Sequence, residues 1–335
     1  MQYNVTDLDN YKIYYDKVLG TGEYSVVYYG VYIGSGNSYL SNNKEVAVKI
    51  INTKNIASIS LNNEIDAAEY IKENPHPNIV EYYDIIRSDE QVYIIMEYCD
   101  CGNLRSLLSD IDKPMKEKWA KYYFSQIANG LQYLNNINVI HRDLKPSNIL
   151  LTNDRSIIKI CDFGFAVKLS NLDNNTICGS PLYMAPETLN NSNYDKTTDL
   201  WAVGLILYEM LFLKHPYDSC NTIPELKSKI NGDNIIIPQF NIYNNNTSNE
   251  CTNLLKGLLQ KDCKKRISWN TFLNNPWLYK YINIINKGIC GYTSVLKSTS
   301  PDCIIPEKSD KLNINIVEDY CNNLMKSDEI FDLDI

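Results

Sequence analysis

The chain has 335 residues, of which 44% are apolar, and a formal net charge of −8 with a pI near 5.1. This length favours one two-lobed domain with a tail. The chain is longer than a domain with one small core and shorter than a typical large multidomain protein. The acidic balance argues against a nucleic-acid or anionic-membrane surface. Ten cysteines are scattered without a paired CxxC framework, which predicts reduced thiols and an intracellular, cytoplasmic location.

The chain carries no pattern typical of secretion or of a membrane span. The polar N-terminus, MQYNVTDLDNYKIYYDK, lacks the apolar core of a signal peptide. The longest apolar run, residues 200–213, contains Glu209 and is shorter than a membrane span requires. We therefore expect residues 198–213 to form a helix that is buried in the middle of a helical lobe.

The first hundred residues read mainly as strands. Residues 19–27, LGTGEYSVV, lead into an alternating pattern and predict a hairpin. Its glycines, Gly20 and Gly22, let the backbone approach a ligand closely, where a Cβ atom would collide. Residues 45–51, EVAVKII, predict a buried strand that carries a single lysine, Lys49. A lysine inside such a strand is costly unless it is paired.

Helical and strand patterns alternate in the next segments. Leu61, Ile65 and Ala68 fall on one helical face, which predicts a helix on this stretch. Residues 81–98 predict a further hairpin around the polar turn 88–90. Apolar residues then recur at helical spacing over residues 115–134, which predicts a core helix of a second lobe.

Two stretches concentrate polar and charged groups between apolar runs. The first, VIHRDLKPSNILL, begins at Val139 and contains Asp143, Lys145 and Asn148. The second, CDFGFA, contains Asp162. A polar turn between buried strands is the simpler alternative. HRDxKxxN followed by DFG at this spacing is, however, far more specific than a single short motif, and the chain resembles a eukaryotic-type protein kinase.

The resemblance implies an α+β, bilobal protein-kinase fold. Residues 11–98 would form a small, mostly β N-lobe with one regulatory helix, and residues 99–280 a larger, mostly α C-lobe. Residues 281–335 match no motif and end in the acidic SDEIFDLDI. A docking tail, a packed extension and disorder remain open for this segment.

The resemblance also assigns catalytic roles. Asp143 would accept or orient the proton of the attacking hydroxyl, and Lys145 would stabilise phosphate charge. Asn148 and Asp162 would bind Mg²⁺, which prefers hard oxygen ligands and arrives with the nucleotide. Ser180 would hydrogen-bond both Asp143 and Lys145.

The same family pattern defines an ATP site. Lys49 would bind the α- and β-phosphates and pair with Glu64, because LNNEI matches the family, while Glu69 is the competing partner. Met96 would guard the rear of the pocket, ahead of the hinge EYCDCGNL. The third glycine of the family's loop is replaced by Ser25. The other expected lining residues are Leu19, Gly20, Thr21, Gly22, Glu23, Tyr24, Val26, Val27, Ala47, Glu97 and Cys99.

The segment that ends in GSPLYMAPE matches the kinase activation segment. Thr176, three residues before Gly179, is the predicted activating phosphosite, modified by an upstream kinase or by another copy of the chain. Arg142, taken as an otherwise unpaired cation, would bind the phosphate with help from Lys168. An unmodified loop threonine is the alternative.

Two further polar contacts follow from the resemblance. Asp199, at the start of the buried helix, would bind backbone amides of the catalytic loop. Arg266 would pair with Glu187 and so close the activation segment onto the last helices.

The motifs predict a serine/threonine protein kinase that uses ATP and Mg²⁺ on protein substrates. EYCDCGNL, DFGFA and CGSPLYMAPE look most like the Unc-51-like, autophagy-initiating kinases. A pseudokinase scaffold is the alternative, although such proteins usually lose a lysine, base or metal-ligand position that is kept here. At the positions where arginine-selecting kinases carry acids, the chain has neutral Asn103 and Ser147 and keeps only Glu209, so the resemblance implies little dependence on substrate arginine. In the family, a large apolar residue after DFG accompanies a preference for serine, and Phe165 therefore implies that preference here.

Overall fold

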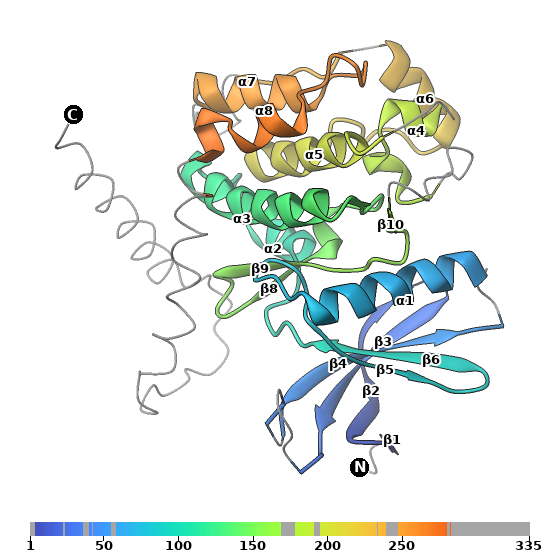
Figure 1. Ribbon diagram of the computed structural model, residues 1–335. Coiled ribbons are helices and arrows are strands. Elements are labelled where there is room, and N and C mark those ends of the chain that lie inside the picture. Colours follow the sequence, from blue (N-terminus) through green and yellow to red (C-terminus); the bar gives the residue numbers. More distant parts are fainter. Residues whose placement is uncertain are drawn as a thin grey trace, which may run out of the picture.

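A computed structural model of the protein describes residues 4–22, 24–35, 40–41, 43–54, 58–168, 178–190, 195–232, 234–238, 247–279 and 282. The chain folds into a sheet-containing N-terminal lobe and a helical C-terminal lobe (Figure 1). This is the bilobal α+β arrangement that the sequence predicts.

A six-stranded antiparallel sheet forms the N-lobe, in the order β1-β2-β3-β4-β6-β5. β4 is its best-buried strand, because its apolar residues meet neighbours on both faces. The short strand β1 was not predicted, and its pairing with β2 extends the sheet ahead of residue 11. The strands are β1 Val5–Leu8, β2 Tyr11–Thr21, β3 Ser25–Tyr32, β4 Glu45–Asn52, β5 Tyr82–Arg87 and β6 Gln91–Glu97.

One helix, α1 (Ser58–Glu73), completes the N-lobe and lies between the sheet and the C-lobe (Figure 1). It packs against β5. Ile65, Ala68 and Ile71 are buried there, which confirms the helical face that the sequence predicts.

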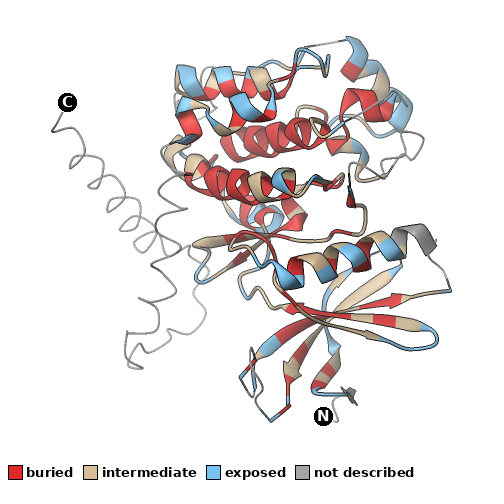
Figure 2. Cartoon of the chain, viewed as in Figure 1, coloured by how far each residue is buried: buried red, intermediate tan, exposed pale blue. Residues whose placement is uncertain are grey.

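The C-lobe is built around two long helices, α3 (Glu117–Asn136) and α5 (Thr198–Phe212). Every residue of α5 is buried, as Figure 2 shows by its nearly continuous red colour. The other helices are α2 Leu104–Asp110, α4 Pro186–Leu189, α6 Ile223–Gly232, α7 Asn249–Leu258 and α8 Trp269–Leu273, with short 3₁₀ turns η1 Pro146–Asn148 and η3 Pro181–Tyr183. Within the described part of the chain, every helix is too short or too polar to cross a bilayer.

Four short strands lie between α3 and η3. Two of them, β8 Ile149–Thr152 and β9 Ile157–Ile160, form an antiparallel hairpin. The other two, β7 Val139–Ile140 and β10 Val167–Lys168, pair with each other although the hairpin separates them in sequence. The two pairs therefore bring the HRD and DFG motifs to the same end of the C-lobe, beside the N-lobe.

The segment between α1 and β5 is fastened to the C-lobe by a buried amide. The side chain of Asn78 donates to Gln126 Oε1 and to the carbonyl of Ile158, both at 3.1 Å, and accepts from Asn129 at 2.9 Å. Asn78 is fully buried. Because a buried amide is costly unless its hydrogen bonds are made, this network fixes the segment in one position.

A second contact fixes the C-terminal end of α1. The Tyr133 hydroxyl of α3 donates to the carbonyl of Asn74 at 2.7 Å, and the Tyr133 ring stacks on His76 with ring centroids 5.0 Å apart. Burial, assisted by the charge of Lys159, lowers the pKa of His76 to about 4. His76 is therefore neutral at physiological pH, which suits a stacked, partly buried ring.

Candidate active site

The loop after β7, which carries the HRD motif, is bound by the first turn of α5. The Asp199 carboxylate accepts the backbone N–H groups of His141, at 2.8 Å, and of Arg142, at 3.0 Å. Burial raises the pKa of Asp199 despite these two hydrogen bonds, which oppose the shift. The predicted contact is thus present, and it holds Arg142 in a left-handed backbone conformation with φ 65°.

Both oxygens of the buried Asp143 carboxylate have hydrogen-bond donors. Oδ1 accepts the backbone N–H of Ser180 at 2.7 Å, and Oδ2 accepts Lys145 Nζ at 2.8 Å and Asn148 Nδ2 at 3.2 Å. Lys145 also donates to the Ser180 hydroxyl at 2.8 Å. The predicted Ser180 contacts are therefore present, with the backbone of Ser180 reaching Asp143 and its hydroxyl reaching Lys145.

Gly179 makes the close approach of Ser180 possible. Its φ is +100°, and a Cβ atom at this position would lie 2.4 Å from the carbonyl oxygen of Arg142. No side chain fits in that space, so only glycine lets the activation segment lie directly on the catalytic loop.

Lys49 joins the N-lobe to the DFG motif. Its Nζ forms an ion pair with Glu64 of α1 and a second one with Asp162 Oδ1 at 2.9 Å. Burial would lower the pKa of Lys49, but the two carboxylates outweigh burial and raise the pKa. Burial likewise would raise the pKa of Asp162, but Lys49 holds it below the usual value.

The competing partner for Lys49, Glu69, is not part of this cluster. It forms an exposed ion pair with Arg87 at 3.1 Å. Glu64, by contrast, is 4% exposed and lies beside Gly164 of the DFG motif. The alternative that the sequence left open is therefore decided in favour of Glu64.

The expected adenine-binding residues share one face of the sheet. Val27 is directly opposite Lys49, and Ala47 is directly opposite Met96. Residues opposite each other, or two apart on one strand, point to the same face. All four therefore point toward the same side as the Lys49 ammonium.

The remaining ATP-site residues belong to the β2–β3 hairpin and the end of β6. Gly20 is opposite Val27, and Thr21 is opposite Val26. Leu19 is 43% exposed. Glu23 lies outside the described residues. Gly22, Tyr24 and Ser25 lie in the hairpin, whereas Glu97 ends β6 and Cys99 follows it in the hinge.

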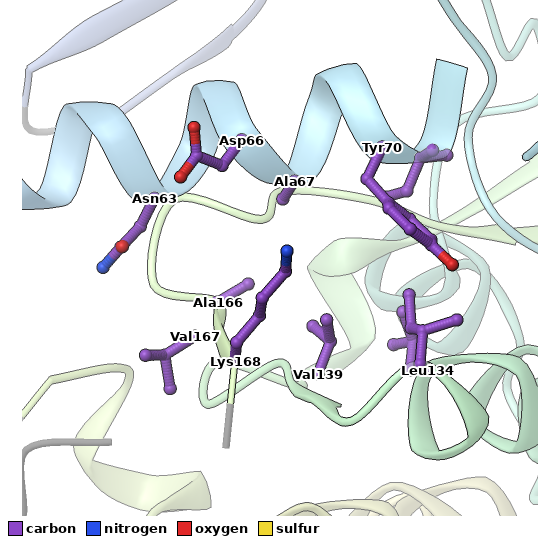
Figure 3. Close-up of a pocket in the computed structure, with 11 residues that line it drawn as sticks. Asn63, Asp66, Ala67, Tyr70, Leu134, Val139, Ala166, Val167 and Lys168 are labelled. Atoms are coloured by element: carbon purple, nitrogen blue, oxygen red, sulfur yellow. The ribbon is translucent and has the colours of Figure 1, made fainter. Parts of the chain in front are cut away.

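The expected phosphate-binding residues need one correction. Arg142 is not an unpaired cation, because its Nε donates to the carbonyl of Phe165 at 2.6 Å. Lys168 lines a pocket beneath α1, where its side chain points toward the helix and its Nζ lies 5.8 Å from the centre of the Tyr70 ring (Figure 3). Thr176 itself lies outside the described residues.

A buried ion pair fixes the end of the activation segment to the loop before α8. Arg266 donates to both oxygens of Glu187, at 2.6 and 2.8 Å, as the sequence predicts. The Arg266 side chain is fully buried and also donates to the carbonyl of Thr197 at 3.1 Å. This bidentate geometry is the strongest form of an arginine–carboxylate contact.

One cluster was missed by sequence reasoning. Glu209 was expected to be an available acid, but Arg105 of α2 lies 2.7 Å from its Oε2, and the Tyr183 hydroxyl donates to its Oε1. The sequence contains no signal for this contact, because the three residues belong to three separate elements.

The described geometry brings together a lysine–glutamate pair, a DFG aspartate and a hydrogen-bonded HRD aspartate. A family model described as "Protein kinase domain" matches residues 13–278. The chain belongs to the protein kinase family. Members of this family transfer the γ-phosphate of ATP with the help of Mg²⁺. That family membership confirms the bilobal fold expected from the motifs.

Several curated kinases are similar to the chain over 78% of its length. Serine/threonine-protein kinase atg1 of Dictyostelium discoideum is 39% identical over 275 residues, and 38% of its own length is covered. ULK3 of Mus musculus is 36% identical over 266 residues, with 53% covered. ATG1a of Arabidopsis thaliana is 34% identical over 263 residues, with 40% covered.

These similarities confirm the predicted resemblance to kinases of the atg1 and ULK type. The chain spans at most about half the length of these three relatives.

Proposed function

We propose that the chain is a serine/threonine protein kinase that transfers the γ-phosphate of ATP to serine or threonine hydroxyls of proteins. The observation that carries this proposal is the environment of Asp143. Its two oxygens are held by Ser180 and Lys145, at 2.7 and 2.8 Å, beside the Lys49 ion pairs. A pseudokinase scaffold is disfavoured, because the lysine, the base and the metal-ligand positions are all kept.

Asp143 would orient the acceptor hydroxyl and receive its proton during transfer. The ammonium of Lys145 lies against the same carboxylate and can approach the transferred phosphoryl group, where its charge would offset developing negative charge. Lys49, fixed by Glu64, would hold the nucleotide phosphates. The serine/threonine assignment is supported by Lys145 and by the names of the relatives.

The donor set near Asp143 fits Mg²⁺. Asp162 offers a carboxylate, and Asn148 offers an amide oxygen because its Nδ2 is held by the carbonyl of Asp143 at 2.9 Å. Hard oxygen ligands of this kind, completed by nucleotide phosphates, suit the ion. Bound Mg²⁺ would supply neutralisation of phosphate charge.

A transfer assay with Mg²⁺, labelled ATP and generic protein substrates tests the proposal. We expect labelled phosphoserine or phosphothreonine from the wild type. Asp143→Asn should reduce turnover by roughly 10²–10⁴-fold, the usual contribution of a general base, while nucleotide binding persists. Near-wild-type turnover of Asp143→Asn at matched purity would exclude Asp143 as the base. Nucleotide binding without any transfer by the wild type would favour the scaffold alternative.

We further propose that phosphorylation of Thr176 activates the enzyme, through an upstream kinase or a second copy of the chain. A phosphate adds about −1.5 to −2 charges at neutral pH and would draw the segment toward the cations Arg142 and Lys168. Mass spectrometry of the active enzyme should find phosphate on Thr176, and Thr176→Ala should lower its activity. An active, unphosphorylated enzyme with a fully active Thr176→Ala variant would contradict this mechanism.

We also propose that residues 11–280 act as the kinase domain and residues 281–335 as an extension. The helical lobe supports a boundary in this region, because the Trp277 indole donates to Glu117 of α3 at 2.7 Å and Leu278 is fully buried. Protein substrates, rather than small molecules, are favoured by the segment Ser180–Tyr183, which lies against Asp143 as a peptide-positioning segment would.

A further inference from the structure

Three residues from separate elements form a closed ring of polar contacts in the C-lobe. Arg105 of α2 pairs with Glu209 of α5 at 2.7 Å between Nη1 and Oε2. Its Nη2 donates to the Tyr183 hydroxyl, and that hydroxyl donates to Glu209 Oε1. Both carboxylate oxygens of Glu209 are therefore occupied by groups of the chain itself.

The ring is connected to the candidate active site through the end of the activation segment. Tyr183 is at the end of η3, three residues after Ser180, whose N–H binds Asp143. Asp143, Ser180 and Tyr183 also line one common hollow. We infer from this proximity that a peptide whose hydroxyl reaches Asp143 passes close to Tyr183 and to the residues bonded to it.

The charge and the burial of Glu209 determine which groups its carboxylate can bind. Glu209 is 4% exposed, and burial of a carboxylate is costly unless a cation or hydrogen-bond donors pair with it. A substrate guanidinium would be the natural external partner, because it matches a carboxylate in charge and shape. Arg105 already supplies that guanidinium, and its side chain is 45% exposed at the surface.

We propose that Arg105 is a specificity-determining residue. It fills, from within the chain, a carboxylate site that would otherwise select an arginine of the substrate. A substrate arginine meets the exposed part of the Arg105 side chain instead of a free carboxylate. The kinase therefore does not select an arginine at this position of the peptide. The inference rests on the proposed kinase function and names the feature of that site which sets its substrate class.

The test compares peptide substrates that differ only in one residue upstream of the acceptor serine, arginine or alanine. The measured quantity is the ratio of kcat/KM for the arginine peptide to that for the alanine peptide. We expect a ratio near or below one for the wild type. In Arg105→Ala the ratio should rise by roughly tenfold or more at one upstream position, as expected for a buried charged hydrogen bond. In Arg105→Ala/Glu209→Gln it should return to the wild-type value.

Arg87→Ala is the matched control, because Arg87 also pairs with a glutamate but does so on the surface of the N-lobe. It should leave the ratio unchanged. Arg105→Met keeps the apolar stem and replaces Arg105→Ala if the latter does not fold. A second measurement uses Glu209→Gln alone, which should not change the wild-type ratio.

A wild-type ratio well above one, or a fall of that ratio in Glu209→Gln, would overturn the inference, since Glu209 would then already bind substrate arginine. An unchanged ratio in a folded, active Arg105→Ala or Arg105→Met variant would overturn it as well. Failure of the proposed function has a different signature, because the wild type would then phosphorylate neither peptide nor any generic protein.

Discussion

Asp162 and Asp143 both place a carboxylate in the candidate site, but their different surroundings indicate different roles. Asp143 is bound by donors of the C-lobe, whereas Asp162 pairs with Lys49 of the N-lobe and keeps a side chain that is 39% exposed. An exposed oxygen suits contact with a metal–nucleotide complex. Substitution of each residue should therefore give a different binding phenotype.

We expect Asp162→Asn to weaken binding of Mg²⁺–ATP by roughly tenfold or more, since even loss of a group that only supports a metal ligand commonly costs that much. A thermal-shift titration with ATP, with and without Mg²⁺, measures this. The Mg²⁺-dependent part of the stabilisation should shrink in Asp162→Asn and persist in Asp143→Asn. Equal Mg²⁺ responses in the two variants would contradict the assigned roles.

At the scale of elements, α1 is tied to β4 by a buried charge. Lys49→Met should destabilise the protein by about 3–5 kcal/mol, because it leaves the Glu64 carboxylate buried without its partner. The side chains of this pair are 12% and 6% exposed, so screening by water is small. Urea unfolding at neutral pH measures the loss in unfolding free energy.

The pH dependence of that loss has a definite sign. The lowered pKa of Asp162 means that its contribution is present above the ordinary value of 3.8 and is lost as the pH falls through the folded-state value. The raised pKa of Lys49 means that its contribution is present below 10.5 and is lost only at higher pH. The difference between wild type and Lys49→Met should thus be constant from about pH 5 to 9 and shrink in acid. A difference that grows below pH 4 would contradict the assignment.

The end of the activation segment is tied to the loop before α8 by Arg266 and Glu187. Arg266→Ala should cost about 3–5 kcal/mol of unfolding free energy, since it leaves a buried carboxylate unpaired. Arg87→Ala, which breaks an exposed pair, should cost at most about 1 kcal/mol. Chemical denaturation of both variants beside the wild type measures the contrast. Equal losses would mean that burial of the Arg266 pair has no energetic effect.

For the whole molecule, the sequence predicted those features that local patterns carry. The HRD and DFG motifs located the site, helical periodicity located α3, and the long apolar run located α5. Periodicity also contains the reason for choosing Glu64 over Glu69, because five residues correspond to about 140° around a helix and place the two on different faces. The short strand β1 was missed because its four residues, VTDL, are too few and do not alternate between apolar and polar side chains.

Contacts between distant elements could not be predicted in the same way. Arg105 and Tyr183 are 78 residues apart in sequence and meet only in the folded chain, where α2 and η3 both reach Glu209 of α5. The partner of Arg142, the carbonyl of Phe165, is a backbone group that exists in any sequence. Local propensity does not determine which of many such groups a long cationic side chain will reach.

The anchoring of Asn78 and Tyr133 has a mechanical consequence for α1. Because the C-terminal end of the helix is fastened to the C-lobe, a movement of α1 must be a swing about that end. Glu64 lies nine residues from the last residue, Glu73, which gives a lever arm of about 13 Å. A swing of only about 10° would carry Glu64 about 2 Å from Lys49, enough to open the ion pair.

When α1 swings about its fixed C-terminal end, residues farther from that end move farther. Amide hydrogen exchange should therefore be fastest in the N-terminal turns of α1 and slow progressively toward Glu73, next to the pivot. Asn78→Ala would remove one of the two contacts that form the pivot, and the gradient of exchange along the helix should become shallower. Uniform amide exchange along α1 in the wild type would show that the C-terminal end of the helix is not held more firmly than its N-terminal end. With the pivot in place, a displacement of the free end of α1 by a few ångströms would separate Glu64 from Lys49.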